Sequence, residues 1–299
     1  MIASINKIFY NSKISDKLVF LLVALLPLNA LIGNLLINLT FITLFFIFIV
    51  DTVFNKNYSF LKDTTFWILF FFFSTLLINL FFSIDPMNSM LRILKVLLMI
   101  SFVIQVKQII EKYPKEFEKI IFGFWSIIFS IVFIDVIFEV IFGFNTLGFK
   151  AAYPGRIASF FGDELIVGYY FFGLGLFYIS QVSVLFKKNI KIFIGLILTL
   201  IFTSLLIGER SNFIKFFICT SIIFFFISKI NFKSTILVIA IFLITFFSLL
   251  NFNEQIKYRY KTQFLDDNSV IGISSFLKNS LYIAHYDAAY RIFKENPIF

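Results

Sequence analysis

Residues 119–142 of this chain read KIIFGFWSIIFSIVFIDVIFEVIF, an apolar run in which Asp135 and Glu139 are the only acidic residues. A helix of this length can cross a hydrocarbon core of about 30 Å. Eight further apolar runs of roughly 16 to 25 residues, read by the same length criterion, occur at approximately 18–33, 35–50, 66–82, 90–106, 159–181, 192–207, 212–228 and 234–250. The sequence therefore predicts an all-α, polytopic membrane protein with about nine transmembrane helices.

The overall composition agrees with this class. Of the 299 residues, 60% are hydrophobic and 14% are charged, and the mean hydropathy of +0.96 lies far above that of soluble proteins. The single cysteine, Cys219, lies inside an apolar run, which excludes a disulfide framework and a cysteine metal site. We expect neither metal nor cofactor, and the net charge of +9 does not indicate nucleic-acid binding.

Lysines predict the orientation of the helices. If the N-terminus is cytoplasmic, fourteen lysines fall on the cytoplasmic side, as the positive-inside rule requires. Residues 1–250 then form the transmembrane domain, and residues 251–299 begin a segment on the outer side. The outer short loops and adjoining helix ends keep only six cations, which are Arg92, Lys95, Lys150, Arg156, Arg210 and Lys215.

All five arginines fall on the outer side in this topology: Arg92, Arg156, Arg210, Arg259 and Arg291. Orientation alone does not explain this, because lysine and arginine serve the positive-inside rule equally well. A planar guanidinium binds phosphate in a bidentate manner that lysine cannot reproduce. The pattern favours an anion site on the outer face, and the alternative is codon bias combined with chance.

Two charge pairs lie on neighbouring helices of this topology. Arg92 and Lys95 share one side of the fourth helix, and Asp135 and Glu139 share one side of the fifth. An unpaired cation inside a membrane costs about 2.5–3.5 kcal/mol on insertion scales. We therefore expect an anion to face Arg92 and Lys95, either from a substrate or from the two carboxylates in a purely structural ion-pair network.

Two short segments concentrate polar groups at outer helix ends. Residues 156–170, RIASFFGDELIVGYY, place Arg156, Asp163 and Glu164 at the mouth of the sixth helix. Residues 208–212, GERSN, form a tight turn in which Ser211 or Asn212 can cap the eighth helix, so that its amides and Arg210 face one side. This corner favours anion binding, and the alternative is an interfacial turn with a Glu–Arg contact.

These two segments, together with residues 285–299, HYDAAYRIFKENPIF, resemble the O-antigen ligase and O-antigen polymerase family of bacterial surface-polysaccharide enzymes, in the same order along the chain. The resemblance implies a metal-independent, GT-C-like glycosyltransferase in the bacterial inner membrane. Such an enzyme transfers or polymerises glycan from undecaprenyl diphosphate at the periplasmic face, onto a glycan or a lipid A-core acceptor. It also implies that Arg210, Arg156, Arg92 and Lys95 hold the diphosphate. Glu209, Asp163 and Glu164 are candidates to orient the acceptor hydroxyl or take its proton.

The end of the chain departs from the family pattern. A glycine-containing turn, a histidine-bearing periplasmic stretch and further helices normally follow the NPIF segment, whereas this sequence stops at Phe299. The sequence therefore looks truncated, and the family's catalytic histidine would lie beyond it. His285, the only histidine here, is a candidate for proton transfer, substrate contact or a structural role.

Two other functional classes fit parts of the pattern. A lipid-linked oligosaccharide flippase or polysaccharide transporter also needs cations that face diphosphate, but it would carry them along a path across the bilayer. Here the charges gather at one face. A structural subunit of an envelope assembly would tolerate replacement of the arginines. Transfer onto lipid A core and polymerisation of repeat units stay open as two versions of the enzyme.

Overall fold

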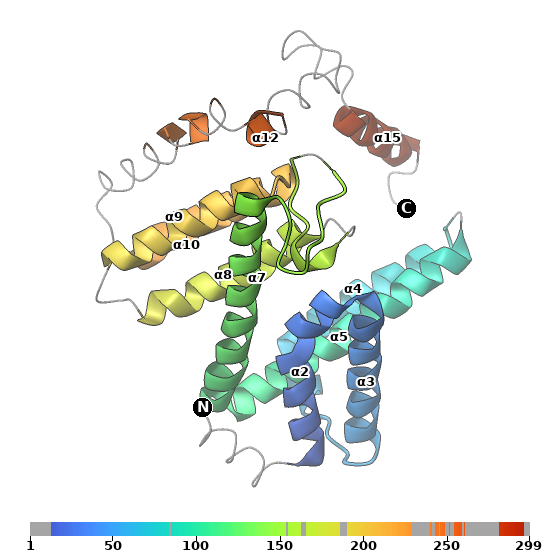
Figure 1. The fold of residues 1–299 in the computed structure, drawn as a ribbon. Helices are drawn as coiled ribbons and strands as arrows, with labels where there is room; N and C mark the ends of the chain where they lie inside the picture. Colours follow the sequence, from blue (N-terminus) through green and yellow to red (C-terminus); the bar gives the residue numbers. More distant parts are fainter. Residues whose placement is uncertain are drawn as a thin grey trace. The chain divides into compact units, whose positions relative to one another are not determined.

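The computed structural model describes residues 13–83, 85–153, 155–162, 166–185, 190–228 and 281–295, with 240, 243–244, 246–248, 251, 254–258 and 260. Every regular element within these ranges is helical (Figure 1). Four stretches are long and apolar enough to cross a membrane: Ile14–Ile32, Asn34–Val53, Pro86–Lys112 and Pro114–Phe142. Two shorter apolar helices, Thr64–Leu80 and Lys191–Leu206, accompany them. The chain is an all-α membrane protein.

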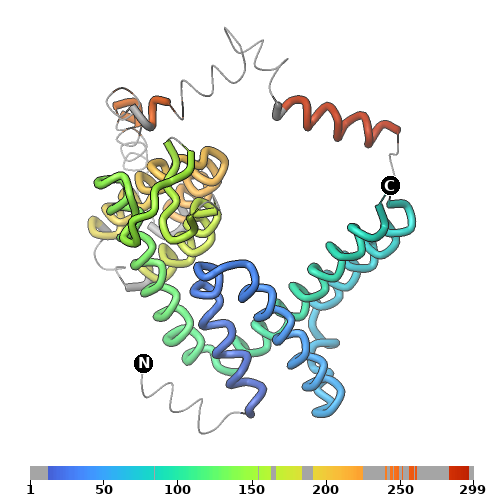
Figure 2. The backbone as a smooth tube through the Cα atoms, turned by 45° about the vertical axis from the view of Figure 1, so that its right-hand side comes forward, coloured from blue at the N-terminus to red at the C-terminus, as the bar shows by residue number. Residues whose placement is uncertain are grey.

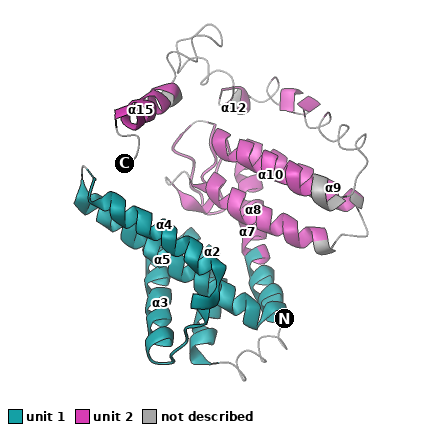
Figure 3. Ribbon diagram, turned by 180° about the vertical axis from the view of Figure 1, so that it is seen from behind, with its two compact units in different colours: residues 1–125, 298–299 teal, residues 126–297 magenta. Residues whose placement is uncertain are grey.

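The chain divides into two compact units, which Figure 3 shows in different colours. Unit 1 comprises Met1–Trp125 with Ile298–Phe299, and unit 2 comprises Ser126–Pro297. Unit 1 contains the first four expected helices. The candidate residues that follow position 126 all belong to unit 2.

Unit 1 is built from two helix pairs. Helices α2 (Ile14–Ile32) and α3 (Asn34–Val53) form a hairpin across Gly33, whose φ of 139° is unfavourable for other residues (Figure 2). Helices α4 (Thr64–Leu80) and α5 (Pro86–Lys112) pack together, and α5 also packs against α3. The core lies where α2 and α3 meet the end of α5 and the following turn, and contains Val23, Leu44 and Ile121.

Local signals explain where α5 begins and ends. The Asp85 carboxylate caps the amide of Asn88, and Pro86 occupies the first helical position, where no amide hydrogen is needed. The helix ends before Pro114, because the residue preceding a proline disfavours helical geometry. Helix α5 therefore extends beyond the expected range 90–106 at both ends.

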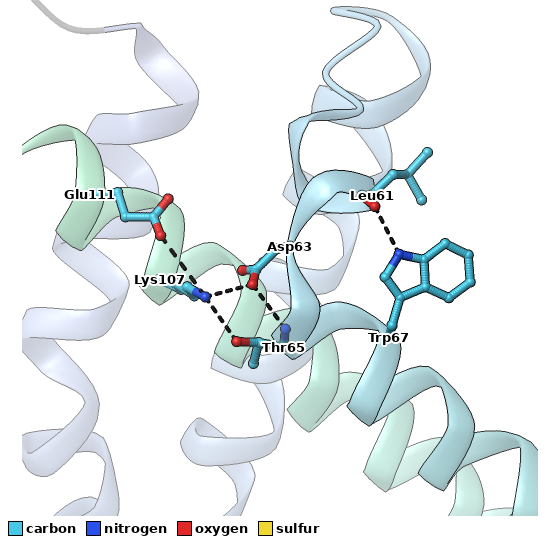
Figure 4. A network of polar contacts seen from close by, with 6 residues as sticks. All are labelled: Leu61, Asp63, Thr65, Trp67, Lys107 and Glu111. Carbon is cyan, nitrogen blue, oxygen red and sulfur yellow. Dashed lines mark hydrogen bonds and ion pairs between the residues drawn. The ribbon is translucent and has the colours of Figure 1, made fainter.

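The start of α4 is fixed by a polar network (Figure 4). Asp63 caps α4 by accepting a hydrogen bond of 2.9 Å from the Thr65 amide, and Lys107 Nζ lies 2.6 Å from Asp63 Oδ1. The hydrogen bond from Lys107 lowers the pKa of the Asp63 carboxyl, and the Thr65 amide acts in the same direction. This network links α4 to α5, although α4 itself has no buried side chain.

The fifth expected helix begins earlier than residue 119. It is continuous through α6 (Pro114–Phe117), a π-helical turn η2 (Glu118–Phe122) and α7 (Gly123–Phe142). In unit 2, the helices α8 (Val167–Leu185), α9 (Ile190–Leu206) and α10 (Arg210–Ser228) pack against one another. Rings of Phe129 on α7, Phe171 on α8 and Phe216 on α10 meet in the core of unit 2, with centroids 5.1 Å apart for Phe129–Phe171 and 5.7 Å apart for Phe171–Phe216.

The expected sixth helix, 159–181, is wrong at its N-terminal end. Residues Ser159–Phe161 form only a short 3-10 turn, η3, and α8 starts at Val167. Ser159 and Gly162 have φ of 47° and 58°, which an α-helix cannot contain. The ninth expected helix, 234–250, lies mostly outside the described residues. Beyond it, α12 (Glu254–Lys257) and the amphipathic α15 (Leu281–Glu295) are described.

Candidate active site

The tight turn between α9 and α10 requires a glycine, Gly208. Gly208 has a φ of 80°, and an added Cβ would collide with the carbonyl oxygen of Gly155. The same Cβ would lie 3.3 Å from the Cα of Arg156. The backbone of residues 155–156 can therefore approach the turn closely because position 208 has no side chain.

A backbone hydrogen bond joins the same two segments. The amide of Ile157 donates to the carbonyl oxygen of Ile207 at 3.2 Å. Consequently Arg156 lies beside the turn that carries Arg210, although 54 positions separate them in the sequence. Both arginines are partly exposed, and Arg210 is the first residue of α10, where the helix amides favour an anion.

Glu209 connects the beginnings of two helices. Its Oε1 accepts a hydrogen bond of 2.9 Å from the Gly168 amide in the first turn of α8. Its Oε2 accepts one of 2.6 Å from Asn212 Nδ2 in the first turn of α10. The side chain is buried, and a Cβ at Gly168 would collide with its carboxylate. Glu209 thus satisfies an N-terminal amide of α8 that has no partner inside its own helix.

The Asp135 carboxylate holds the loop that leads to Arg156. Asp135 Oδ1 accepts from the amide and hydroxyl of Thr146, at 2.8 and 2.6 Å. Oδ2 accepts from the Ser159 hydroxyl at 2.6 Å. Only 1% of Asp135 is exposed, so its carboxylate makes almost no contact with water. The three hydrogen bonds from Thr146 and Ser159 replace those that water would otherwise provide.

Glu139 holds the other side of the loop through backbone groups. Its two oxygens accept from the amides of Ala158 and Ser159, at 3.0 and 2.6 Å. Nearby, the buried Asn145 donates to the Ser159 carbonyl at 2.5 Å and accepts from the amide of Phe149 at 2.8 Å. These contacts support the left-handed backbone of Ser159, a conformation that non-glycine residues rarely adopt.

Within unit 2 the α7 carboxylates bind a loop, and their expected pairing with Arg92 and Lys95 stays a prediction. All described hydrogen bonds of Asp135 and Glu139 come from residues 146–159, within unit 2. Arg92 and Lys95 are exposed in the first turns of α5 in unit 1. The i,i+4 spacing correctly placed both carboxylates on one side of α7, but that side binds a loop.

The other candidate residues are found in different surroundings. His285 is exposed on α15, and Asp163 and Glu164 lie outside the described residues. Lys215 lies with its ammonium 5.6 Å from the ring centroid of Tyr169, which adds a cation beside the start of α8. Within the described part of the chain, no cluster of three His, Cys, Asp or Glu side chains could hold a metal ion.

Sequence reasoning found only part of the corner. It expected Ser211 or Asn212 to cap the helix, whereas α10 already begins at Arg210 and the Asn212 side chain donates to Glu209. Asn145, Ser159, Gly168 and Asn212 do not form a motif, and their roles depend on partners between 3 and 41 positions away. The small cavity between Gly155 and Gly208 holds only about 10 Å³. This cavity is too small for a ligand as large as diphosphate.

Comparisons of the chain with protein-family profiles, with curated proteins and with solved structures found no match.

Proposed function

We propose that this protein transfers glycan from a lipid diphosphate carrier at the membrane surface. The observation that carries the proposal is the close backbone contact between Gly155–Arg156 and Gly208, which brings two arginine-bearing segments together. The corner they form also contains the beginning of α10. Guanidinium groups at a helix N-terminus are suited to an anion with several oxygens, such as diphosphate.

The chemistry follows from where charge develops. When an acceptor hydroxyl attacks the anomeric carbon, the bond from that carbon to the diphosphate oxygen breaks, and negative charge grows on the diphosphate. Cations held in place beforehand stabilise this charge more in the transition state than in the ground state. Arg156 and Arg210 take this role in our proposal.

The remaining candidates have separate tasks. Glu209 positions the turn, because both of its carboxylate oxygens bind helix-start groups. We assign the orientation of the acceptor hydroxyl, or the removal of its proton, to Asp163, Glu164 and His285. The finer version of the proposal is a GT-C-like enzyme with about nine spans and a cytoplasmic N-terminus in a bacterial inner membrane. It acts as an O-antigen ligase or polymerase on undecaprenyl-diphosphate-linked glycan.

Replacement of Arg210 tests the proposal. Arg210→Lys keeps the charge but loses the bidentate fork, so it should lose much of the activity, and Arg210→Ala nearly all. One contact of this kind is worth about 2.7–4 kcal/mol, which corresponds to roughly a 10² to 10³ lower rate. Lys150→Ala is the matched control, because it removes an exposed cation from the same loop system.

The assay follows glycan transfer from purified lipid-linked glycan to an acceptor by protein reconstituted in lipid. The proposal predicts a reduced catalytic rate for the Arg210 variants with unchanged expression, and normal transfer for Lys150→Ala. Full transfer by a well-expressed Arg210→Ala protein would remove Arg210 from the site. Movement of the carrier across the bilayer without any transfer by the unaltered protein would favour a flippase instead.

A further inference from the structure

A polar cavity of about 590 Å³ lies at one end of unit 1. It opens where α2 begins and where α3 and α5 end, and its volume is in the range of small-ligand sites. Its wall contains three carboxylates, Asp16, Asp51 and Glu111, and three lysines, Lys13, Lys56 and Lys112. All residues that line this cavity belong to unit 1, whereas Arg156, Gly208 and Arg210 belong to unit 2.

One buried acceptor in this wall has no partner in the part of the chain that the structure describes. Gln105 is only 5% exposed, and its Nε2 donates to the backbone oxygens of Leu44 and Ser101, at 2.9 and 3.1 Å. These two acceptors fix the orientation of the amide, since a flipped amide would place oxygen against oxygen. Gln105 Oε1 is left without a hydrogen-bond partner among the described residues. A buried acceptor in this situation favours a ligand that brings a donor.

The charges around the cavity differ in how they are paired. Asp16 binds the ammonium of Lys112 and accepts from the Tyr113 hydroxyl at 3.0 Å. Asp51 accepts only from the neutral amides of Asn55 and Asn57, both at 2.8 Å, so its negative charge is not matched by a described cation. Lys13, in turn, takes part in none of the described ion pairs. The cavity therefore offers separate places for a cation and an anion.

An apolar groove adjoins the polar cavity. It measures about 650 Å³ and shares Lys13, Ser15, Ile47 and Asn55 with the cavity wall. Its other lining residues include Ile14, Leu18, Phe46 and Val50, which are 75%, 43%, 60% and 47% exposed on α2 and α3. A charged cavity continuous with an exposed apolar groove at the end of membrane-spanning helices matches the shape and chemistry of a lipid.

We propose that this cavity and groove bind one glycerophospholipid whose headgroup carries a primary ammonium, such as phosphatidylethanolamine. The ammonium pairs with Asp51, beside the Gln105 side chain in the cavity wall. The phosphate pairs with Lys13, which borders both spaces, and an acyl chain lies along the groove between α2 and α3. A choline headgroup has no N–H to donate, and a glycerol headgroup lacks the positive charge that matches Asp51.

Lipid-dependent thermal stability of the purified full chain in nanodiscs tests this site. Phosphatidylethanolamine should raise the Tm of the unaltered protein by several degrees relative to phosphatidylcholine or phosphatidylglycerol. Asp51→Asn and Lys13→Ala should remove most of this difference. Lys62→Ala, which removes an exposed cation outside the cavity wall, should retain it.

A second variant addresses the groove without touching the charges. Thr43 lines the groove and is not in the buried core, so Thr43→Trp should fill the groove while the protein stays folded. We expect this variant to lose the phosphatidylethanolamine effect and to retain less co-purified lipid by native mass spectrometry. Equal stabilisation by phosphatidylglycerol or phosphatidylcholine would overturn the proposed headgroup. An unchanged lipid preference in both Asp51→Asn and Thr43→Trp would overturn the site itself.

Discussion

Exchange of each α7 carboxylate for its amide should have unequal effects. In Glu139→Gln, the side-chain oxygen of glutamine can still accept from one of the two loop amides. Its NH₂ group then faces the other backbone N–H, so that two donors meet, and a backbone N–H cannot rotate away. One charge-assisted hydrogen bond is lost, at roughly 1.5–3 kcal/mol, and buried donors are left unpaired, at about 1–3 kcal/mol. We expect a loss of about 3–5 kcal/mol in the free energy of loop opening.

Asp135→Asn should cost less, about 1–2 kcal/mol. The oxygen of asparagine can keep both donors of Thr146, and the Ser159 hydroxyl can rotate to accept from the new NH₂ group. The two residues are almost equally buried, with 2% and 1% exposed, so burial does not distinguish them. The difference arises because Glu139 faces fixed backbone donors and Asp135 faces a rotatable hydroxyl.

Limited trypsin digestion measures this difference at the loop itself, because Lys150 is an exposed cleavage site between the two anchored ends. At a tenfold change for about every 1.4 kcal/mol, Glu139→Gln should raise cleavage after Lys150 by roughly 10² to 10³, if opening precedes cleavage. Asp135→Asn should raise it by about tenfold. Equal rates for the two variants, or a larger effect of Asp135→Asn, would refute the hydrogen-bond assignment.

Three further outcomes follow from the structure. Gly208→Ala should lower the Tm by several degrees, because the φ of 80° at position 208 and the close contact with Gly155 exclude a Cβ. Gly195→Ala is the control: a Cβ at this position in α9 meets open space, so the Tm should be unchanged or higher. The hydrogen bond from Lys107 lowers the pKa of Asp63 in the folded protein. The ionised Asp63 therefore stabilises the fold above its unfolded pKa of about 3.9, and this stabilisation is lost as the pH falls through the lower folded pKa. Asp63→Asn should remove this part of the acid dependence of stability in a pH series, and an unchanged series would contradict it. In a Cys219→Ser background, a membrane-impermeant thiol reagent should fail to label Lys115→Cys in intact spheroplasts, and labelling there would reject the proposed orientation.

Apolar run length was sufficient to predict most of the helices. Helices are described at eight of the nine expected positions, and the ninth, 234–250, lies mostly outside the described residues. Hydropathy is a good guide here because it determines which segments can enter lipid. It failed at the ends of helices, where single residues decide. Hydropathy does not reveal that α5 starts at Asp85–Pro86, and it predicts helix before Val167, where Ser159 adopts a left-handed conformation.

The candidate site was predictable only in part. Residue type was enough to select Arg156 and Arg210 as candidates, because a guanidinium suits phosphate better than an ammonium does. Their proximity was not encoded in any local pattern, since it depends on Gly208 admitting the backbone of Gly155. Likewise, the spacing of the α7 carboxylates gave their common side but not their partners. Long-range hydrogen bonds decide such pairings, and a single sequence does not display them.

The link from Glu209 to Gly168 also bears on how the protein is made. The carboxylate that completes the start of α8 is encoded 41 residues after the amide it serves. At a synthesis rate of about 5–20 residues per second, α8 emerges several seconds before that partner does. During this interval the first turn of α8 lacks this hydrogen-bond partner, so the final packing of α8 must await translation of Glu209. A ribosome stalled before residue 209 should therefore hold an α8 that is inserted but not yet locked.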